Sequence, residues 1–547
     1  MPRQLSQIAT SPKGLFEAWH IRLGTTWFSI ALRAGFLGTL IAVVYWPSFR
    51  GGFIWDDVLY FRDTPSIRDA NGLTRIWFST ECRDYYPVTY SVYWAEWHLW
   101  HGRTIGYHML NFALHTAGAL LLWWSLTRWG VEGAWFAAAL FAVHPVNVPS
   151  VSWICEVKNL LAFPLALLSL IAFQQYKQSQ RQPFYAAALV CFILSLLAKP
   201  AVVGLPIVLG VAVWCRDARL RRRDFLELIP FFAVAVISGL ITVLFQTYRA
   251  LRGEQVLAEN FVQRSAGAGW AIWFYFFKAV LPMKLSILYS TWGFEHASLA
   301  AYFPTCLFMA IIVYLWLRRR ELRVWFAATV CYLALLLPVL GFFDQGYYAY
   351  ARVADHWQYF ALPVVCVLIV RLLRKLSNGA WCKIGTLVVF AVFGATTWQR
   401  AHAFASDEAL WRQTISDNPE AWLAHYQFAN YQARRNDWTS ASRYYEKTLT
   451  INPAFAPAHY NLATALIHGN ELRQAAEHLE QACGLNPREF TWRFKLGLLY
   501  LRLGEPAKAR AEFKAVLLRH PDYEPAYRAL SEMDEPSADG LSTQRKD

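Results

Sequence analysis

Two adjacent carboxylates, Asp56 and Asp57, follow the first long apolar run of the chain and stand beside Trp55. Carboxylates at a membrane surface are costly to keep ionised, so the pair needs a cation, a hydrogen-bond donor or a catalytic task. In a catalytic role, one carboxylate takes a proton from an acceptor hydroxyl while its neighbour orients it or a nearby base. The alternative is structural, with the pair capping a helix that runs from Val58 to Phe61.

Polar side chains also accompany the apolar runs that follow. His108, Asn111 and His115 lie at i, i+3 and i+7, on one face of a predicted helix. We favour a hydrogen-bond network between helices for this face over a substrate wall. His144, at the outer end of a predicted span, is a candidate substrate-binding residue. Neither the nine scattered cysteines nor the histidines have the spacing of a metal site or a disulfide framework.

The chain that must position these residues is apolar and basic. It has 547 residues, of which 56% are hydrophobic, and a formal net charge of +14. The Lys and Arg residues gather between apolar runs, at 177–181, 216–223, 318–323 and 371–383. This distribution is typical of the cytoplasmic loops of membrane proteins and argues against a nucleic-acid partner.

Eleven apolar segments are candidates for crossing a bilayer, which takes about 20 residues, or about 17 where neighbours shield the ends. The first lacks a cleavage signature, so we predict a retained span after a cytoplasmic segment, 1–26. The predicted crossings are 27–46, 107–127, 132–146, 150–174, 184–199, 201–214, 226–247, 300–317, 323–342, 357–374 and 383–399.

The basic clusters determine the predicted orientation. We predict that 268–289 is re-entrant or interfacial, because a full crossing would put the cluster 318–323 on the side opposite the others. Eleven crossings then place the loop 47–106, and the chain after residue 399, on the external side. That side is the periplasm if the membrane is a bacterial inner or plasma membrane, and the lumen if it is the endoplasmic reticulum.

Residues 407–535 carry a helical repeat with a period of 34 residues. Its markers are prolines, small residues and large apolar residues in constant phase, namely Pro419, Pro453, Pro487 and Pro521, then Ala429, Ala463 and Gly497, Ala441, Ala475 and Ala509, and Tyr445, Leu479 and Phe513. This pattern is typical of tetratricopeptide repeats, in which paired helices stack into a solenoid. We predict a groove that holds a peptide or partner protein, with a structural spacer as the alternative. The tail 536–547 is predicted to be disordered.

Short motifs in a constant order run through the apolar region. They are Trp55-Asp56-Asp57, Tyr85-Tyr86-Pro87-Val88-Thr89, His108-Met109-Leu110-Asn111 with His115, Phe141 to Asn147, Glu156 to Leu161, Lys199-Pro200, Leu281-Pro282 through Tyr289, and Ala354 to Tyr359. The ordered set resembles membrane enzymes of the glycosyltransferase C fold. Within them it is most similar to the transmembrane tetratricopeptide-repeat protein O-mannosyltransferases and their bacterial relatives. The resemblance covers nearly all of 27–399, and the repeats follow where that family has them.

The chain departs from the family pattern mainly by losing cations. The familiar Tyr-Arg-Pro is Tyr85-Tyr86-Pro87 here, Glu-Arg-Lys is Glu156-Val157-Lys158, and Arg-Tyr is His356-Trp357. The Glu that usually follows His-Pro is also replaced, near Pro149. These departures leave the phosphate contacts and the donor sugar open.

The resemblance implies a donor in which a sugar is linked to a polyprenyl phosphate. A Lys or Arg held beside apolar walls neutralises the phosphate that forms as the sugar leaves. Lys158 and Lys199 are the first candidates, and snorkelling to the headgroups is the competing explanation for Lys158. Arg249 and Arg264 are further candidates. The predicted substrate-binding residues are Tyr86, His144, Glu156, Tyr289 and His356.

The sequence thus predicts an all-α integral membrane glycosyltransferase, residues 27–399, followed by a tetratricopeptide-repeat solenoid. It would transfer a sugar, mannose by resemblance, with inversion to a Ser or Thr hydroxyl of a protein that the repeats present. Asp56 is the predicted base and Asp57 assists it. No cofactor is firmly implied, although a divalent cation could bridge either Asp to the donor phosphate. The same residues are also compatible with a non-catalytic scaffold or transporter, and with transfer to a lipid or glycan.

Overall fold

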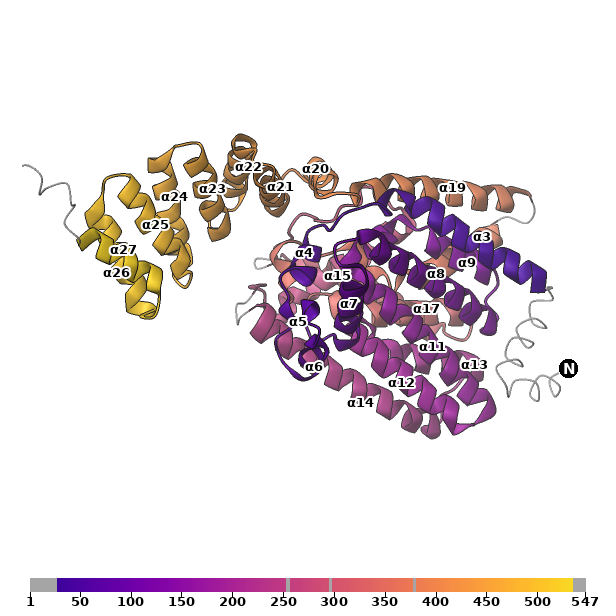
Figure 1. Ribbon diagram of the computed structural model, residues 1–547. Coiled ribbons are helices and arrows are strands. Elements are labelled where there is room, and N and C mark those ends of the chain that lie inside the picture. Colours follow the sequence, from indigo (N-terminus) through magenta and orange to yellow (C-terminus); the bar gives the residue numbers. More distant parts are fainter. Residues whose placement is uncertain (1–26, 252–255, 295–297, 377–379, 535–547) are drawn as a thin grey trace, which may run out of the picture. The chain divides into compact units, whose positions relative to one another are not determined.

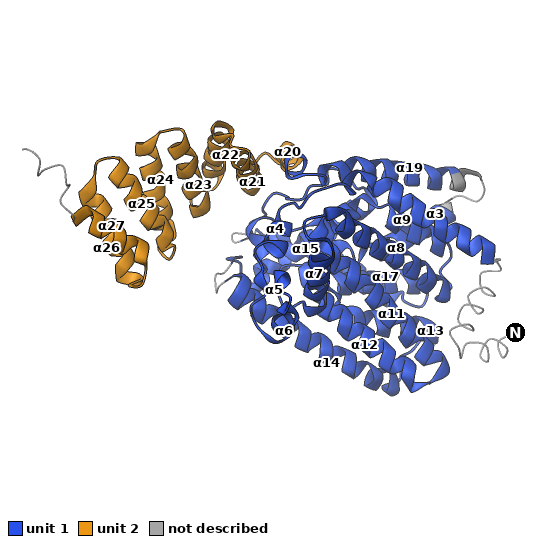
Figure 2. Cartoon of the chain, viewed as in Figure 1, with its two compact units in different colours: residues 1–410 blue, residues 411–547 orange. Residues whose placement is uncertain are grey.

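The computed structural model describes residues 27–251, 256–294, 298–376 and 380–534, and every regular element in these ranges is a helix. The predicted all-α fold is therefore confirmed. The predicted segments 1–26 and 536–547 lie outside the described residues. The chain divides into two compact units, residues 1–410 and residues 411–547 (Figure 2).

The first unit is a bundle of α-helices, and some of its connections contain single turns of 3-10 helix. Its α-helices are α3 (Trp27–Tyr45), α4 (Asp56–Phe61), α5 (Pro65–Arg68), α6 (Gly72–Phe78), α7 (Pro87–Trp100), α8 (Thr104–Arg128), α9 (Ala134–Ala142), α10 (Val148–Ser152), α11 (Val157–Ser179), α12 (Gln182–Ala198), α13 (Leu205–Asp217), α14 (Arg222–Phe245), α15 (Phe261–Val280), α16 (Phe303–Leu317), α17 (Arg323–Leu336), α18 (Leu362–Leu376) and α19 (Ala380–Ala403). The single turns used below are η2 (Pro145–Asn147), η3 (Ile154–Glu156), η4 (Pro200–Val202), η7 (Leu337–Val339) and η9 (Asp355–Gln358).

Six helical stretches among the described residues are long and apolar enough to cross a membrane, and a seventh results if two helices bent by 47° form one span. The six are Trp27–Ser48, Thr104–Arg128, Ile154–Ser179, Pro200–Asp217, Arg222–Ala250 and Leu299–Leu317. The bent pair is Ala134–Ala142 with Pro145–Ser152. The count of eleven crossings stays a prediction, because α12, α17 and α18 are shorter than a full span.

The long helices pack in a row that Figure 1 shows side by side. In this row α19 packs on α3, α3 on α8, α8 on α11, α11 on α12 and α12 on α14. Ile229, Phe232 and Ile237 of α14 are 56%, 43% and 58% exposed. Such a face would be costly in water, whereas hydrocarbon solvates it and the helix satisfies its own backbone groups.

The segment predicted to be re-entrant, 268–289, is half helix and half irregular chain. The helix α15 ends at Val280 and packs on α16 and α18. The Lys278 ammonium then donates to the carbonyls of Met283 and Lys284, at 2.7 and 2.9 Å. The chain that follows these bonds reaches η9, where the Tyr289 hydroxyl donates to Asp355.

The predicted external loop 47–106 folds into the short helices α4 to α7, which pack through aromatic side chains. Phe61 is fully buried, and its ring centroid lies 4.9 Å from that of Tyr93 and 5.0 Å from that of Tyr107. These contacts hold α4 against α7 and α8. The orientation of the acidic pair at the start of α4 is therefore fixed by a packed aromatic core.

The second unit is a stack of helix pairs with the predicted 34-residue period. Its helices are α20 (Asp407–Asp417, which begins in the first unit), α21 (Trp422–Arg434), α22 (Trp438–Ile451), α23 (Ala456–His468), α24 (Leu472–Leu485), α25 (Phe490–Arg502), α26 (Pro506–Arg519) and α27 (Glu524–Asp534). The predicted small residues are fully buried where helices cross. A Cβ atom added at Gly497 would lie only 2.5 Å from Cε1 of the buried Phe513. Close crossing of α25 and α26 therefore requires the glycine.

A methyl group at this crossing should open the third repeat. We expect Gly497→Ala to destabilise the second unit by about 1–3 kcal/mol, because the packed Phe513 ring must move. Gly484→Ala is the matched control, since its Cβ would meet no atom within 4 Å. Hydrogen exchange of the full-length protein, followed by mass spectrometry, measures the effect. Amides of α25 and α26 should lose protection only in Gly497→Ala, and equal protection in both variants would contradict this packing.

Candidate active site

Asp57 is a buried hydrogen-bond acceptor that connects two parts of the first unit. Its side chain is inaccessible to solvent, and its two carboxyl oxygens accept the backbone N–H groups of Ile54, at 2.9 Å, and Cys155, at 2.8 Å. The first bond closes the start of α4, and the second joins α4 to η3. Burial raises the pKa of Asp57 to about 8, although both backbone bonds oppose the rise. Asp57 thus positions the acidic pair.

Asp56 is placed differently, with a carboxyl that is partly exposed. Among the described residues, no hydrogen-bond or ion-pair partner of this carboxyl is present. Burial raises the pKa of Asp56, and the charges of Lys158 and Arg83 counteract that rise. An unpaired carboxyl between two cations is available to accept a proton from a substrate.

The residue before Asp56 has a strained backbone. Trp55 has φ 44° and ψ −114°, a conformation that costs a residue with a side chain of order 1–3 kcal/mol. Two contacts hold it there. Its N–H donates to Oδ1 of Asp407 at 3.2 Å, and its ring stacks on Trp153 with centroids 5.1 Å apart. These contacts hold the backbone that leads directly into Asp56.

Glu156 holds two ammonium groups beside this carboxyl. Its Oε1 lies 2.9 Å from Nζ of Lys158, and its Oε2 lies 3.2 Å from Nζ of Lys199. The Glu156 side chain is 2% exposed and each lysine side chain 12% exposed. Asn159 donates to the same Oε2 at 2.7 Å. Glu156, Lys158 and Lys199, all predicted from the sequence, therefore form one buried cluster with a net positive charge.

Arg83 is a site residue that the sequence predictions omitted. Its side chain is exposed, and its charge acts on Asp56 and on the neighbouring Asp84. Asp84 in turn accepts from Nε2 of Gln246 at 2.7 Å. The motif Tyr85-Tyr86-Pro87 lacks the usual arginine, and Arg83 stands just before it in the chain. A search for a displaced cation near the altered motif could have found it.

An apolar cavity of about 320 Å³ begins at this cluster. Its polar lining includes Lys199, Asn159, Tyr86 and Gln246, together with Asp344 and Gln345 from the chain that follows η7. The remaining lining is mainly apolar and comes from α14, from η7 and from the chain around η9, including Val236, Leu240, Val243, Leu337, Val339 and Phe360. The cavity can hold an isoprenoid or acyl chain with its charged end at Lys199.

The other predicted site residues lie in separate surroundings. His144 is fully buried, and its ring nitrogens bond to the carbonyl of Ala279, at 2.8 Å, and the N–H of Val146, at 3.3 Å. Arg264 donates to the carbonyls of Leu257, Glu259 and Phe342 and lies 2.8 Å from Asp344. These contacts hold the fold together and leave neither side chain pointing at Asp56.

Two more predicted residues, Tyr289 and Arg249, have structural contacts. The Tyr289 hydroxyl donates to Oδ1 of Asp355 at 2.8 Å, and Arg400 pairs with the other oxygen at 2.6 Å. Arg249 is exposed and donates to the carbonyl of Glu81 at 3.2 Å. Neither reaches the lysine cluster.

His356 is the predicted residue that borders the lysine cluster. Its backbone carbonyl accepts from Asn159 at 3.2 Å, and its ring packs edge-on against Trp153. Burial lowers the pKa of His356 to about 3, although the charge of Glu156 opposes this. The ring is therefore neutral at any ordinary pH and acts by shape and hydrogen bonding. The described residues contain no cluster of three or more His, Cys, Asp or Glu that could hold a metal ion.

Comparison with known proteins supports the resemblance that the sequence motifs indicated. The tetratricopeptide repeat family matches residues 426–489 and 460–525. The chain is 23% identical over 421 residues to "Protein O-mannosyl-transferase F38B6.6" of Caenorhabditis elegans, an alignment that covers 71% of this chain and 58% of that protein. The mouse proteins "Protein O-mannosyl-transferase TMTC1" and "TMTC3" are 28% and 26% identical over 163 and 154 residues. These alignments cover 27% and 26% of this chain, and 17% and 16% of the mouse proteins. The chain therefore spans less than two thirds of the length of each of these relatives.

The buried Asp57 should make stability depend on pH. In the folded state its pKa is about 8, against an ordinary value of 3.8, so between these values the folded protein holds a proton that the unfolded chain releases. The free energy of unfolding should therefore decrease as pH rises through this window, and level off above it. Melting temperatures measured in detergent from about pH 5 to about pH 9 should show this slope.

Asp57→Asn tests the origin of the slope, because the amide does not titrate. Its NH₂ group must also face one of two backbone N–H donors, so the variant should lose about 1–3 kcal/mol at low pH. Asp63→Asn, at an exposed position, is the matched control. If the slope of stability against pH is the same in wild-type and Asp57→Asn, the Asp57 carboxyl does not titrate as the structure indicates.

Proposed function

We propose that the chain is an integral membrane glycosyltransferase that moves a sugar from a polyprenyl-phosphate donor to a hydroxyl group of a protein. The relatives are named protein O-mannosyl-transferases, which supports mannose as the sugar and a protein as the acceptor. The single observation that carries the proposal is the unpaired carboxyl of Asp56 near a buried, net positive Glu156–lysine cluster whose Lys199 lines an apolar cavity.

The donor would bind with its lipid in the cavity and its phosphate at the cluster. The apolar walls solvate the isoprenoid chain, and Lys199 stands at the polar end. Lys158 and Lys199 share one carboxylate, so the cluster keeps one positive charge for the phosphate. Arg83 supplies a second, exposed cation on the Asp56 side.

The reaction would be a single displacement at the anomeric carbon. Asp56, as the carboxylate, takes the proton of the acceptor hydroxyl while that oxygen attacks the sugar. The bond between the anomeric carbon and the phosphate oxygen breaks, and its electron pair stays on the phosphate. The cations stabilise the charge that develops there in a site with little water, where such interactions are strongest. Attack from the side opposite the phosphate inverts the configuration.

Asp56→Asn should abolish transfer without loss of donor binding. General-base catalysis contributes about 10²–10⁴-fold, and we expect a loss in that range for label transferred from a polyprenyl-phosphate sugar to protein. Donor affinity should stay within about threefold or rise slightly, because a negative charge near the phosphate is removed. Asp63→Asn serves again as the control. Full transfer activity in a correctly folded Asp56→Asn protein would end the assignment of Asp56 as the base.

Lys199→Met should weaken donor binding more than any cation outside the cluster. The variant leaves Glu156 neutralised by Lys158 alone, so the net charge offered to the phosphate disappears. A lost charged hydrogen bond of about 1.5–3 kcal/mol corresponds to about 10–100-fold in affinity for polyprenyl phosphate. Arg249→Met is the control, because that side chain lies apart from the cluster. Equal loss in both variants would show that the phosphate binds elsewhere.

A further inference from the structure

The bond between Trp55 and Asp407 ties the acidic pair to a distant part of the chain. The Trp55 N–H donates to Oδ1 of Asp407 at 3.2 Å, although 352 positions separate the two residues in the sequence. Trp55 directly precedes Asp56, and its φ of 44° and ψ of −114° persist in a residue with a side chain only where the surroundings hold them. The partner of this N–H therefore helps to determine where Asp56 lies.

The helix α20 is capped by Ser406, which leaves Asp407 as its first residue. The Ser406 hydroxyl accepts the N–H of Ala409 at 3.2 Å, and the Ser406 carbonyl accepts the N–H of Leu410 at 3.0 Å. These are the bonds of an N-cap residue. A carboxylate in the first turn favours a helix through the helix dipole, but the bond to Trp55 serves a second segment. The role of Asp407 thus extends beyond its own helix.

The chain before Asp407 is fixed against the loop that carries Trp55. After α19 the Phe404 N–H closes a turn on the carbonyl of Ala401 at 3.2 Å, and the Phe404 side chain is 2% exposed. A Cβ atom added at Gly51 would lie only 3.1 Å from the carbonyl oxygen of Phe404. The two segments that meet in the Trp55–Asp407 bond are therefore already in close backbone contact a few residues earlier.

We propose that Asp407 is a positioning residue for the transfer reaction, which holds Asp56 toward the acceptor hydroxyl through the backbone of Trp55. The assignment of Asp56 as the base rests on the proposed function, whereas the order that Asp407 gives to the loop does not. The helix α20 begins in the first unit and continues into the second. The placement of the base therefore depends on a helix of the repeat region.

The kinetic test compares two substitutions of Asp407. Asp407→Ala should lower kcat about 10–100-fold, because displacing a reacting group by about 1 Å can cost about a hundredfold. KM for the polyprenyl-phosphate donor should stay within about twofold, since the lysine cluster is unchanged. Asp407→Asn should keep kcat within about threefold of wild type, because its amide oxygen accepts the same N–H. A role confined to the helix dipole predicts equal losses in both variants, since both lack the charge.

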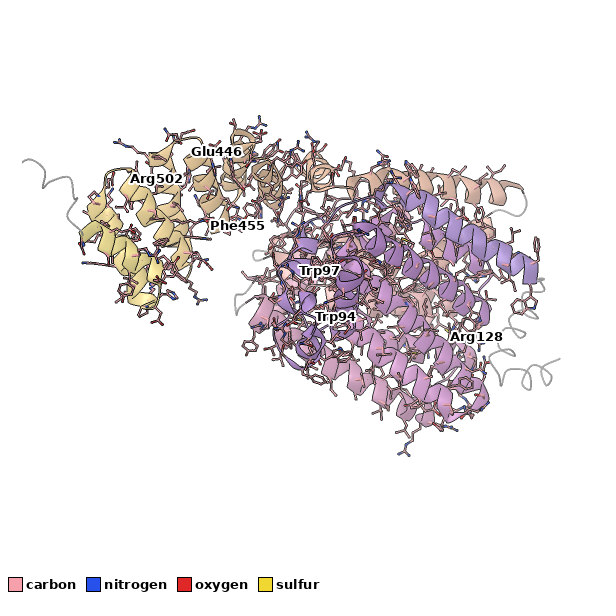
Figure 3. All side chains as sticks on the ribbon, in the orientation of Figure 1. Trp94, Trp97, Arg128, Glu446, Phe455 and Arg502 are labelled. Atoms are coloured by element: carbon pink, nitrogen blue, oxygen red, sulfur yellow. The ribbon has the colours of Figure 1, made fainter. Side chains whose placement is uncertain are left out.

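Hydrogen exchange of the full-length protein in detergent, followed by mass spectrometry, tests the bond without any transfer. Peptides covering residues 54–61 should exchange at least about tenfold faster in Asp407→Ala, and within about threefold of wild type in Asp407→Asn. Two controls each remove one exposed carboxylate, Asp417→Ala at the other end of α20 and Glu446→Ala on α22, where Figure 3 labels the residue. Both controls should match wild type in exchange and in kcat.

Unchanged exchange or unchanged kcat in Asp407→Ala would overturn the proposal, as would an equal loss in Asp407→Asn or Asp417→Ala. A wild-type protein that transfers no sugar would instead end the proposed function. The exchange measurement still applies in that case, and faster exchange in Asp407→Ala alone would support the order that Asp407 gives to the loop.

Discussion

A buried carboxylate held between two ammonium groups is the interaction on which the candidate site depends. Without Glu156 the two ammonium groups would be left as uncompensated buried charges, so the carboxylate must be placed between Lys158 and Lys199. The bent helices α9 and α10 lead into η3 and Glu156, and the junction of α12 with η4 supplies Lys199. Two cations on one carboxylate also leave a charge that an anion can satisfy. The arrangement that buries the carboxylate thus also leaves one positive charge in the cluster.

The acidic pair shows how neighbouring carboxylates acquire different tasks from their surroundings. Asp57 accepts two backbone N–H groups and is fully buried, so it orders the loop and cannot reach a substrate. Asp56 has no hydrogen-bond or ion-pair partner among the described residues, and it directly follows the strained Trp55. The capping hypothesis was right in part, since the pair does begin α4, but neither carboxyl caps it from the N-cap position, which Trp55 occupies. The strain is maintained by contacts that come from distant parts of the first unit, Trp153 and Asp407.

The sequence predicted features that depend on residues close together in the chain better than features that depend on distant residues. The repeat could be predicted in detail, because each 34-residue unit packs only on its neighbours and Gly497 stands where one helix crosses the next. Glu156 and Lys158 were predicted separately as site residues, and their closeness in the chain lets them form an ion pair. The partners of His144 and Arg264 could not be predicted, since these side chains bond to backbone carbonyls that sequence patterns do not identify. Arg83 was not predicted because it lies just before the altered motif Tyr85-Tyr86-Pro87, whereas the family's arginine lies inside that motif.

The positive charges of the two units lie in physically different surroundings. The lysines of the first unit are buried, so an anion bound by them would lie in a low dielectric from which counterions are excluded. Lys495 and Arg502 are exposed, and charges in water are screened beyond about 8 Å at physiological ionic strength. Added salt should therefore weaken interactions made by these exposed cations, whereas the affinity of the buried lysine cluster for an anion should change little.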